Sequence, residues 1–425
     1  MTPEEESGPG GEPTGGGGSR GEGAPEGRDV DGKIVGEPTG ADASDDRHGP
    51  APRLRWKVVG AAAGTAAVLV VAAGIASVVS VPYYAITPGS GVPVSSLVAV
   101  PRRYAHSHLG GVMLTDVELV PLRALSYLYY ELDSSAQVVP SSELVGTATS
   151  SEYQQQGIVD MADARQAATV VALDTLGYRT RAVPSGVTVY QPEPGTAAAR
   201  GLAVGDVITA VDGSRVRTVA GLVSAIGAHS PGESVALSVH KLVGGAARVV
   251  RIRLGEIRAS STAPTAPAVC APVGTDTSLP PVEVHGAPAP CVGIVGALQA
   301  YTTVGLPFPV SLSADGIQGP SAGLAFTLGL IEKLDSKDLT AGLKIAATGT
   351  MSVTGQVGDV GGVAQKTIAV RDAGAALFFV PPQEYATAQA HAGPNLKVLA
   401  VSTIAQAVAD LEGLGGQLVL PSHSH

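Results

Sequence analysis

The chain has few of the residues that build disulfide frameworks, metal sites or aromatic binding platforms. Its 425 residues include two cysteines, one tryptophan and only 4% aromatic residues. The cysteines fit no zinc-ligand spacing and no His-Glu-x-x-His sequence occurs, so we expect neither a metal site nor a cofactor. No basic stripe with interleaved aromatic residues is present, which argues against nucleic acid as a partner.

Charge is also scarce and unevenly placed. Charged residues make up 15% of the chain and hydrophobic residues 44%, enough apolar material for two or three domains and a membrane segment. Residues 1–50 hold 12 acidic and 4 basic residues, which accounts for most of the net charge of −10. Because this segment also contains 14 glycines, we predict a disordered tail over residues 1–52. A solvated leader is favoured over a docking tail.

A long uncharged run follows the tail. Residues 58–81 hold 24 residues without a charge, which at about 1.5 Å per residue can span a hydrocarbon core of about 30 Å. Basic residues lie between Arg53 and Lys57, and none follows until Arg102. We therefore predict a single-pass plasma-membrane anchor over residues 53–82, which contacts the lipid bilayer through residues 58–81. The positive-inside rule places the N-terminus in the cytoplasm and the residues after the anchor outside the cell. A cleaved signal peptide and a buried soluble helix are weaker alternatives.

Both cysteines fall on the predicted outer side. Cys270 and Cys291 flank a proline-rich stretch within residues 258–290, which the composition predicts to be an extended linker. In an oxidising compartment, a disulfide here would close a loop of about 20 residues and stabilise the fold by about 3 kcal/mol. Free thiols are the alternative.

Two regions lie between the anchor and this linker. Residues 83–181 are predicted to form a mixed region, with a strand over residues 111–120 and a helix over residues 161–176. Residues 182–257 alternate β-branched runs with turns, and the Asp-Gly pair at Asp212 predicts a hairpin. The role of the first region is not evident from its residues.

The second region resembles a PDZ domain of the kind found in bacterial envelope proteases. The resemblance is carried by residues 198–208 (AARGLAVGDVI) and by Asp212-Gly213. It implies a groove that binds the C-terminus or an exposed extended segment of a polypeptide as an added strand. A PDZ-like fold used only as a spacer is the alternative.

Residues 308–331 contain the first chemical motif. A short strand over residues 309–313 leads through a Gly-Pro corner into an apolar helix that begins near Ser321. The first N–H groups of a helix have no intrahelical partner, so those near Ser321, including that of Ala322, could hold a developing oxyanion. On this motif alone, a simple N-cap role for Ser321 is equally well supported.

The same motif contains two glycines beside the serine. We expect Gly319 and Gly323 to leave room for a substrate backbone to approach closely.

A second motif supplies a candidate base. Residues 348–362 predict a hairpin around Thr354-Gly355 and a glycine-rich corner, after which a helix over residues 363–373 carries Lys366 near its start. Lys366 falls on an apolar side, whereas Gln365 is expected to project away. Desolvation and the helix dipole both lower the pKa of such a lysine, which suits a neutral general base. A lysine whose amine reaches water is the alternative.

Together the two motifs resemble the proteolytic domain of Lon-type serine peptidases. The matching residues are Gly319-Pro-Ser-Ala-Gly323 and Gly361-Gly-Val-Ala-Gln-Lys366. The chain is similar to the membrane-anchored bacterial subgroup that pairs this domain with a PDZ domain. The resemblance implies a nucleophile at Ser321, a base at Lys366 and a lysine-orienting threonine at Thr348.

The resemblance also sets the expected organisation. The fold class is α/β and α+β multidomain, with one transmembrane helix, a PDZ-like β domain and a Lon proteolytic α/β domain over residues 291–415, followed by a tail over residues 416–425. A homo-oligomeric ring is implied by the resemblance alone. The chain departs from the family at Thr350, where an acidic residue is common, and at Ile317-Gln318, where charged residues are usual.

No Gly-x-x-x-x-Gly-Lys-Ser/Thr phosphate loop occurs in the sequence. We therefore expect an ATP-independent serine endopeptidase that cleaves unfolded or tail-presenting polypeptides. A catalytically silent PDZ-based envelope scaffold is the main alternative, and nucleotide-linked work by the same domain is a weaker one.

Overall fold

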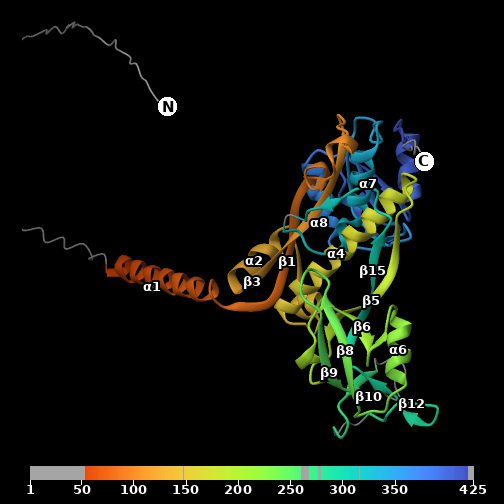
Figure 1. The fold of residues 1–425 in the computed structure, drawn as a ribbon. Coiled ribbons are helices and arrows are strands. Elements are labelled where there is room, and N and C mark those ends of the chain that lie inside the picture. The colour runs from red at the N-terminus through yellow and green to blue at the C-terminus, as the bar shows by residue number, and fades with distance from the viewer. Residues whose placement is uncertain (1–52, 147, 260–267, 276–278, 315, 420–425) are drawn as a thin grey trace, which may run out of the picture. The chain divides into compact units, whose positions relative to one another are not determined.

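A computed structural model describes residues 53–146, 148–259, 268–275, 279–314 and 316–419 (Figure 1). The tail expected over residues 1–52 lies outside these ranges, as do residues 420–425 of the expected C-terminal tail. Helix α1 (Arg53–Ala76) covers most of the uncharged run. Within the described ranges, no helix has both the length and the hydropathy needed to cross a membrane.

A six-stranded mixed sheet forms the centre of one domain. Its strand order is β21-β20-β17-β3-β1-β4. Its strands are β1 (Ser80–Pro93), β3 (Gly111–Arg123), β4 (Gln137–Pro140), β17 (Lys344–Ala347), β20 (Leu377–Val380) and β21 (Lys397–Ala400). Strand β17 pairs in parallel with β3 on one side and with β20 on the other. Strands from distant parts of the chain thus lie side by side.

This pairing corrects the separate region expected over residues 83–181. Strands β1 and β3 belong to the same sheet as β17, β20 and β21. Helix α4 (Ser150–Thr175) packs against α7 (Gly323–Leu334) in one hydrophobic core. Residues 80–176 therefore supply half of the domain that was expected to begin at residue 291. Each segment has an ordinary local pattern, and only the pairing between them shows that they form one domain.

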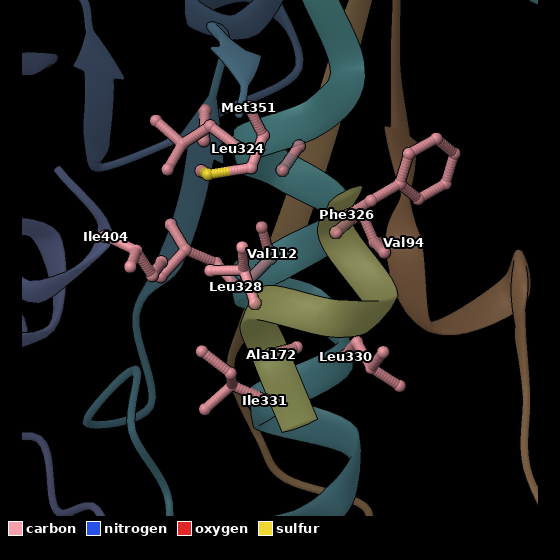
Figure 2. Close-up of a cluster of buried hydrophobic side chains, with 14 of the residues drawn as sticks. Val94, Val112, Ala172, Leu324, Phe326, Leu328, Leu330, Ile331, Met351 and Ile404 are labelled. Atoms are coloured by element: carbon pink, nitrogen blue, oxygen red, sulfur yellow. The ribbon is translucent and has the colours of Figure 1, made fainter. Parts of the chain in front are cut away.

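Helix α7 is enclosed by this core. Nearly all of its side chains are buried, as expected of a helix that is apolar on every side. Figure 2 shows the cluster around it, in which side chains from α7 meet those from α4, β3 and the segments around Met351 and Ile404. The cluster fixes the helix that directly follows the turn of the candidate nucleophile.

Shorter elements complete this domain. They are β2 (Val98–Ala99), α2 (Ala124–Leu132), α3 (Ser141–Val145), β16 (Ser311–Leu312), β18 (Thr350–Met351), β19 (Val357–Gly358), α8 (Val363–Asp372), α9 (Tyr385–His391) and α10 (Ile404–Gly413). Strands β18 and β19 pair antiparallel, which confirms the hairpin predicted around Thr354-Gly355.

A second sheet has the order β15-β5-β6-β8-β9, with β7 paired to β6. Its elements are β5 (Arg181–Pro192), α5 (Ala198–Gly201), β6 (Asp206–Val211), β7 (Ser214–Arg215), α6 (Val219–Gly227), β8 (Ser234–Lys241), β9 (Arg248–Arg253) and β15 (Ile294–Val304). Asp212 and Gly213 have φ angles of 46° and 80°. These positive values are those of the hairpin turn that the Asp-Gly pair predicts.

Strand β15 makes the second sheet an insertion in the first domain. The sequence boundary at residue 291 assigned this strand to the proteolytic domain, but β15 pairs with β5 along its length, from Ile294 with Pro192 to Val304 with Arg181. The chain therefore enters and leaves this unit at neighbouring positions. The unit has its own hydrophobic core, built around residues such as Val189, Leu237 and Ile252.

The expected linker over residues 258–290 is partly folded. Strands β10 (Gly255–Arg258), β11 (Val269–Ala271) and β14 (Pro290–Cys291) form a small sheet, and β12 (Glu283–Val284) pairs with β13 (Ala287–Pro288). Cys270 and Cys291 form a disulfide with a Cα–Cα distance of 5.9 Å. The predicted pairing is thus confirmed, and it joins β11 to the segment that leads into β15.

Candidate active site

Backbone contacts hold Ser321 at the entrance of α7. The serine lies in a short 3-10 turn (Pro320–Ala322) that continues into the helix. The preceding Gly319 has a φ of 92° and donates its N–H to the carbonyl of Gly157 on α4 at 3.0 Å. The Ser321 carbonyl accepts the N–H of Gly349 at 2.9 Å. The turn is therefore held from α4 on one side and from the segment after β17 on the other.

Thr348 and Ala322 adjoin the serine. Thr348 is buried, and its hydroxyl donates to the Ser321 carbonyl at 3.3 Å. This contact supports the turn that carries the serine, and the expected role of Thr348 in orienting Lys366 stays a prediction. Ala322 is buried in the same turn, and its role as an oxyanion donor also stays a prediction.

The two glycines of the motif differ in their surroundings. Gly319 needs its positive φ, and a Cβ there would meet nothing within 4 Å, in agreement with an open approach. A Cβ on Gly323 would lie 2.7 Å from the backbone nitrogen of Met351 and 2.8 Å from its Cβ. The expectation for Gly323 is therefore wrong: its space is filled by β18, against which α7 packs.

Lys366 is buried in the first turns of α8. Its side chain is 3% exposed, and the helix begins after Gly362, whose φ is 67°. Val363 and Val370 on the same side are buried as predicted, but Gln365 is buried too, so α8 is covered on more sides than its pattern suggests. Burial lowers the pKa of Lys366 to about 8, against the opposing effect of the Asp116 and Glu384 carboxylates.

Ser321 and Lys366 line the same cavity, which has a volume of about 700 Å³. A second cavity of about 300 Å³ shares both residues and extends to the glycine-rich corner at residues 359–362. No histidine lines either cavity, and within the described ranges no hydrogen bond joins the Ser321 hydroxyl to the Lys366 amine. A serine and a buried lysine of lowered pKa thus line one space, a pairing suited to nucleophilic catalysis.

Two segments of the chain match known protein families. Residues 302–410 match the C-terminal proteolytic domain of the Lon protease (S16) family. Residues 174–254 match the PDZ domain family. The chain pairs a PDZ domain with a Lon-type proteolytic domain. The Lon-type match includes Ser321, Thr348 and Lys366, and it indicates a serine peptidase.

Solved structures with similarity to the chain include two bacterial domains. The crystal structure of the PDZ domain of an SdrC-like protein from Listeria monocytogenes is 26% identical, covers 16% of this chain and 72% of that chain, and has a TM-score of 0.16. The solution structure of the second domain of a listeria protein is 19% identical, covers 26% of this chain and 85% of that chain, and has a TM-score of 0.18.

The Lon-type cavity also has walls that the motifs do not reveal. Asp116 on β3, Tyr153 and Asp160 on α4, and Tyr190 on β5 all line it. The Tyr190 hydroxyl donates to Asp160 at 3.0 Å, so the PDZ strand β5 reaches the cavity that Ser321 and Lys366 line. The sequence around Asp116 and Asp160 does not mark them as site residues, because an aspartate in a strand or on a helix is common. The pairing of β3 with β17 brings Asp116 to the site.

Carboxyl groups at this wall are poorly solvated. Burial raises the pKa of Asp160, although the hydrogen bond from Tyr190 opposes this effect. Burial and the neighbouring Asp160 raise the pKa of Asp163 to about 7. Of these two residues, Asp160 lines the cavity, so burial favours the neutral form of one carboxyl group in the wall formed by α4 and β5.

Proposed function

We propose that the protein is a membrane-anchored, ATP-independent serine endopeptidase with a Ser321–Lys366 dyad and a PDZ domain that recognises the substrate. The observation that carries the dyad is the shared cavity, in which the buried amine of Lys366 has a pKa of about 8. The Lon-type match over residues 302–410 supports the same chemistry.

Each group then has one task in the reaction. The neutral Lys366 amine takes the proton of the Ser321 hydroxyl as its oxygen attacks the peptide carbonyl. The resulting ammonium returns that proton to the leaving amine as the peptide bond breaks. Water then hydrolyses the acyl-enzyme with Lys366 again as the base. Asp116, which stabilises the ammonium form, keeps the lysine basic enough to accept the proton.

The edge of β3 offers a binding surface for the substrate backbone. Strand β1 pairs with β3 as far as Arg123, but β17 pairs only with residues Gly111–Leu114. The opposite edge of β3 beyond Thr115 thus has no strand partner within the described part of the chain, and Val117 and Leu119 from this stretch line the cavity. We propose that an extended substrate adds to this edge beside Ser321.

The PDZ domain has an edge suited to recognition. Strand β15 is at the edge of the PDZ sheet, and among the described residues β5 is its one strand partner, while helix α6 lies near it. We propose that substrate tails add to the free edge of β15. Residues 305–315 connect β15 to the cavity-lining residues 316–321, so the strand that would hold the tail is close in sequence to the loop that carries the proposed nucleophile.

The anchor and the independence from ATP are supported by the sequence. The run over residues 58–81 carries no charge, and no phosphate loop occurs in the chain. Apolar side chains at the end of α1 and just after it, such as Val68, Leu69 and Val78, are exposed. Exposed apolar side chains of this kind are typical of a segment that is covered by lipid.

The decisive experiment uses the full-length protein in detergent, without nucleotide, and casein as an unfolded substrate. Ser321→Ala and Lys366→Ala should each lower kcat by at least about a thousandfold. Ser336→Ala and Lys397→Ala are matched controls at exposed positions of the same domain and should leave kcat unchanged. Equal cleavage by all four variants and the unmodified protein would exclude the dyad.

The same variants separate the enzyme from a silent scaffold. A scaffold would show no cleavage by the unmodified protein while still binding extended peptides through the PDZ domain. Capture of an uncleaved substrate by Ser321→Ala, together with its cleavage by the unmodified protein, would instead support the peptidase.

A further inference from the structure

Three side chains with metal-ligand chemistry converge far from Ser321 in the Lon-type domain. His108 precedes β3, Glu332 lies in the last turn of α7, and Asp338 lies in the loop before β17. One ring nitrogen and one oxygen of each carboxylate lie within 4.8 Å of one another. The three residues come from separate segments, so no spacing pattern in the sequence could reveal the group.

The carboxylates of this group lack an ion-pair partner among the described residues, although Lys333 lines the same cavity. Glu332 is 6% exposed, and within the described ranges no lysine or arginine forms an ion pair with Glu332 or Asp338. A buried carboxylate without a positive partner is costly. A bound cation would remove that cost.

One ring nitrogen of His108 is held by a backbone carbonyl. The Nε2 atom of His108 lies 3.1 Å from the carbonyl oxygen of Asp335. A carbonyl only accepts, so Nε2 carries a proton, and in the neutral imidazole Nδ1 then has the lone pair that a metal ion needs. A histidine ligand almost always donates its other nitrogen to a carbonyl or carboxylate in this way.

The carboxylates are held in place by backbone groups. Glu332 accepts the N–H of Leu339 at 3.1 Å, and Asp338 accepts the N–H of Gly342 at 2.9 Å. The Thr340 hydroxyl lies between the two carboxylates, 2.8 Å from Asp338 and 3.4 Å from Glu332. Each carboxylate offers about four lone-pair positions, so these bonds leave positions for a cation. A Cβ on Gly110 would collide with the backbone of Leu343, which shows how closely the His108 segment packs on the loop of Asp338.

We propose that His108, Glu332 and Asp338 bind one divalent cation of the zinc or manganese class. An imidazole with two carboxylates suits these ions, whereas calcium prefers oxygen ligands alone. A cavity of about 180 Å³ lined by His108 and Glu332 gives room for a water as a further ligand. Lys333 also lines this cavity, and its charge limits the affinity.

The cation would join the segments that lead into β3, out of α7 and into β17. Because α7 begins beside Ser321, we expect the ion to stabilise the scaffold of the Lon-type domain without contacting the reacting groups. The proposal is therefore independent of the peptidase chemistry, and it holds even where cleavage is not detected.

The test is binding of Zn²⁺ or Mn²⁺ to the full-length protein in detergent after removal of metals with a chelator. All variants carry His423→Ala and His425→Ala, so that the C-terminal histidines add no site. We expect one ion per chain by calorimetry and a higher Tm with the ion. His108→Ala and Glu332→Gln should weaken binding at least tenfold. The control His106→Ala, in the same segment but outside the group, should bind normally.

Asp338→Asn and the visible absorption of bound Co²⁺ provide a second variant and a second readout. A spectrum typical of nitrogen and oxygen ligands that is lost in His108→Ala supports the site. Absence of binding at millimolar metal, equal binding by the His108→Ala and His106→Ala variants, or a Tm that no ion changes would overturn the proposal.

Discussion

The environment of Lys366 has two opposing effects on its charge. Burial removes the amine from water and lowers its pKa, while Asp116 and Glu384 favour the ammonium form. The balance leaves a pKa of about 8 rather than the ordinary value of 10.5. A base with this pKa is partly neutral at physiological pH and still accepts a proton from serine during attack.

This balance predicts the pH dependence of cleavage. Only the neutral amine is active, so kcat/KM should rise as the pH passes through about 8 and then level off. At pH 7 roughly one-tenth of the maximal rate is expected. The measurement is the initial rate on a fluorogenic peptide from pH 6 to 10. A profile that is flat over this range would contradict a titrating base at Lys366.

The same burial predicts a cost in stability. Below pH 8 the lysine is charged in both the folded and the unfolded chain, and the folded state bears the full penalty of burying the charge. Between pH 8 and 10.5 the folded lysine loses its proton first, so the penalty shrinks as the pH rises.

Lys366→Met should therefore be inactive but more stable than the unmodified protein by on the order of 2–3 kcal/mol at pH 7. The gain should fade towards pH 10.5, where the penalty vanishes. Denaturant unfolding at pH 7 and pH 10 measures it, with Lys397→Met at an exposed position as the control. A lower stability of Lys366→Met at both pH values would show that the amine makes net favourable contacts in the fold.

The start of α7 is positioned by close packing on β18. Because Gly323 has the backbone of Met351 where a Cβ would lie, Gly323→Ala must shift either the helix or the strand. Ser321 lies in the preceding turn, so we expect at least a tenfold loss of kcat with little change in secondary structure by circular dichroism. Gly413→Ala, at the end of α10 with nothing within 4 Å of the added methyl, is the control. Equal activity of the two variants would show that the turn tolerates the shift.

Local patterns predicted most of the single elements. The hairpin at Asp212, the helix that carries Lys366 and the turn at Ser321 all follow from turn residues and apolar spacing that act over a few positions. The domain boundaries did not follow, because parallel pairing of β3 with β17 leaves no trace in either segment. For the same reason the wall of the site formed by Asp116 and Asp160 could not be found from the motifs.

Helix α2 carries apolar side chains with no protein cover. Leu128, Tyr129 and Leu132 are 62%, 65% and 88% exposed, which is unusual for neighbouring positions on one short helix. The helix begins where the N–H of Ala124 donates to the carbonyl of Val79, which lies at the end of the uncharged run. An apolar and aromatic helix at this position suits the interface of a bilayer.

Contact of α2 with lipid can be measured by fluorescence. With the single tryptophan removed by Trp56→Phe, Tyr129→Trp reports on α2 and Tyr385→Trp reports on α9. In vesicles that contain brominated lipid, we expect stronger quenching at position 129 than at position 385, although both are exposed in the protein. Equal quenching would contradict lipid contact of α2. It would instead indicate that another protein surface covers the exposed face of this helix.

The PDZ unit is inserted between two halves of the Lon-type domain, yet the two have separate hydrophobic cores. Strands β5 and β15 join them as a paired stem that begins and ends at Arg181 and Val304. Such an arrangement lets one domain unfold while the other keeps its packing, since few core side chains are shared.

Leu237→Ala tests this division of the chain. Leu237 is fully buried in the PDZ core, so the change should cost about 2–5 kcal/mol and lower the temperature at which hydrogen exchange in β6 and β8 becomes fast. Cleavage of a short peptide should persist, because Ser321 and Lys366 depend on the other core, whereas cleavage of casein should fall as recognition of tails is lost. Val249→Ala, exposed on β9, is the control. If short-peptide cleavage fell in parallel with casein cleavage, the link from Tyr190 to Asp160 would be the route by which PDZ folding shapes the catalytic cavity.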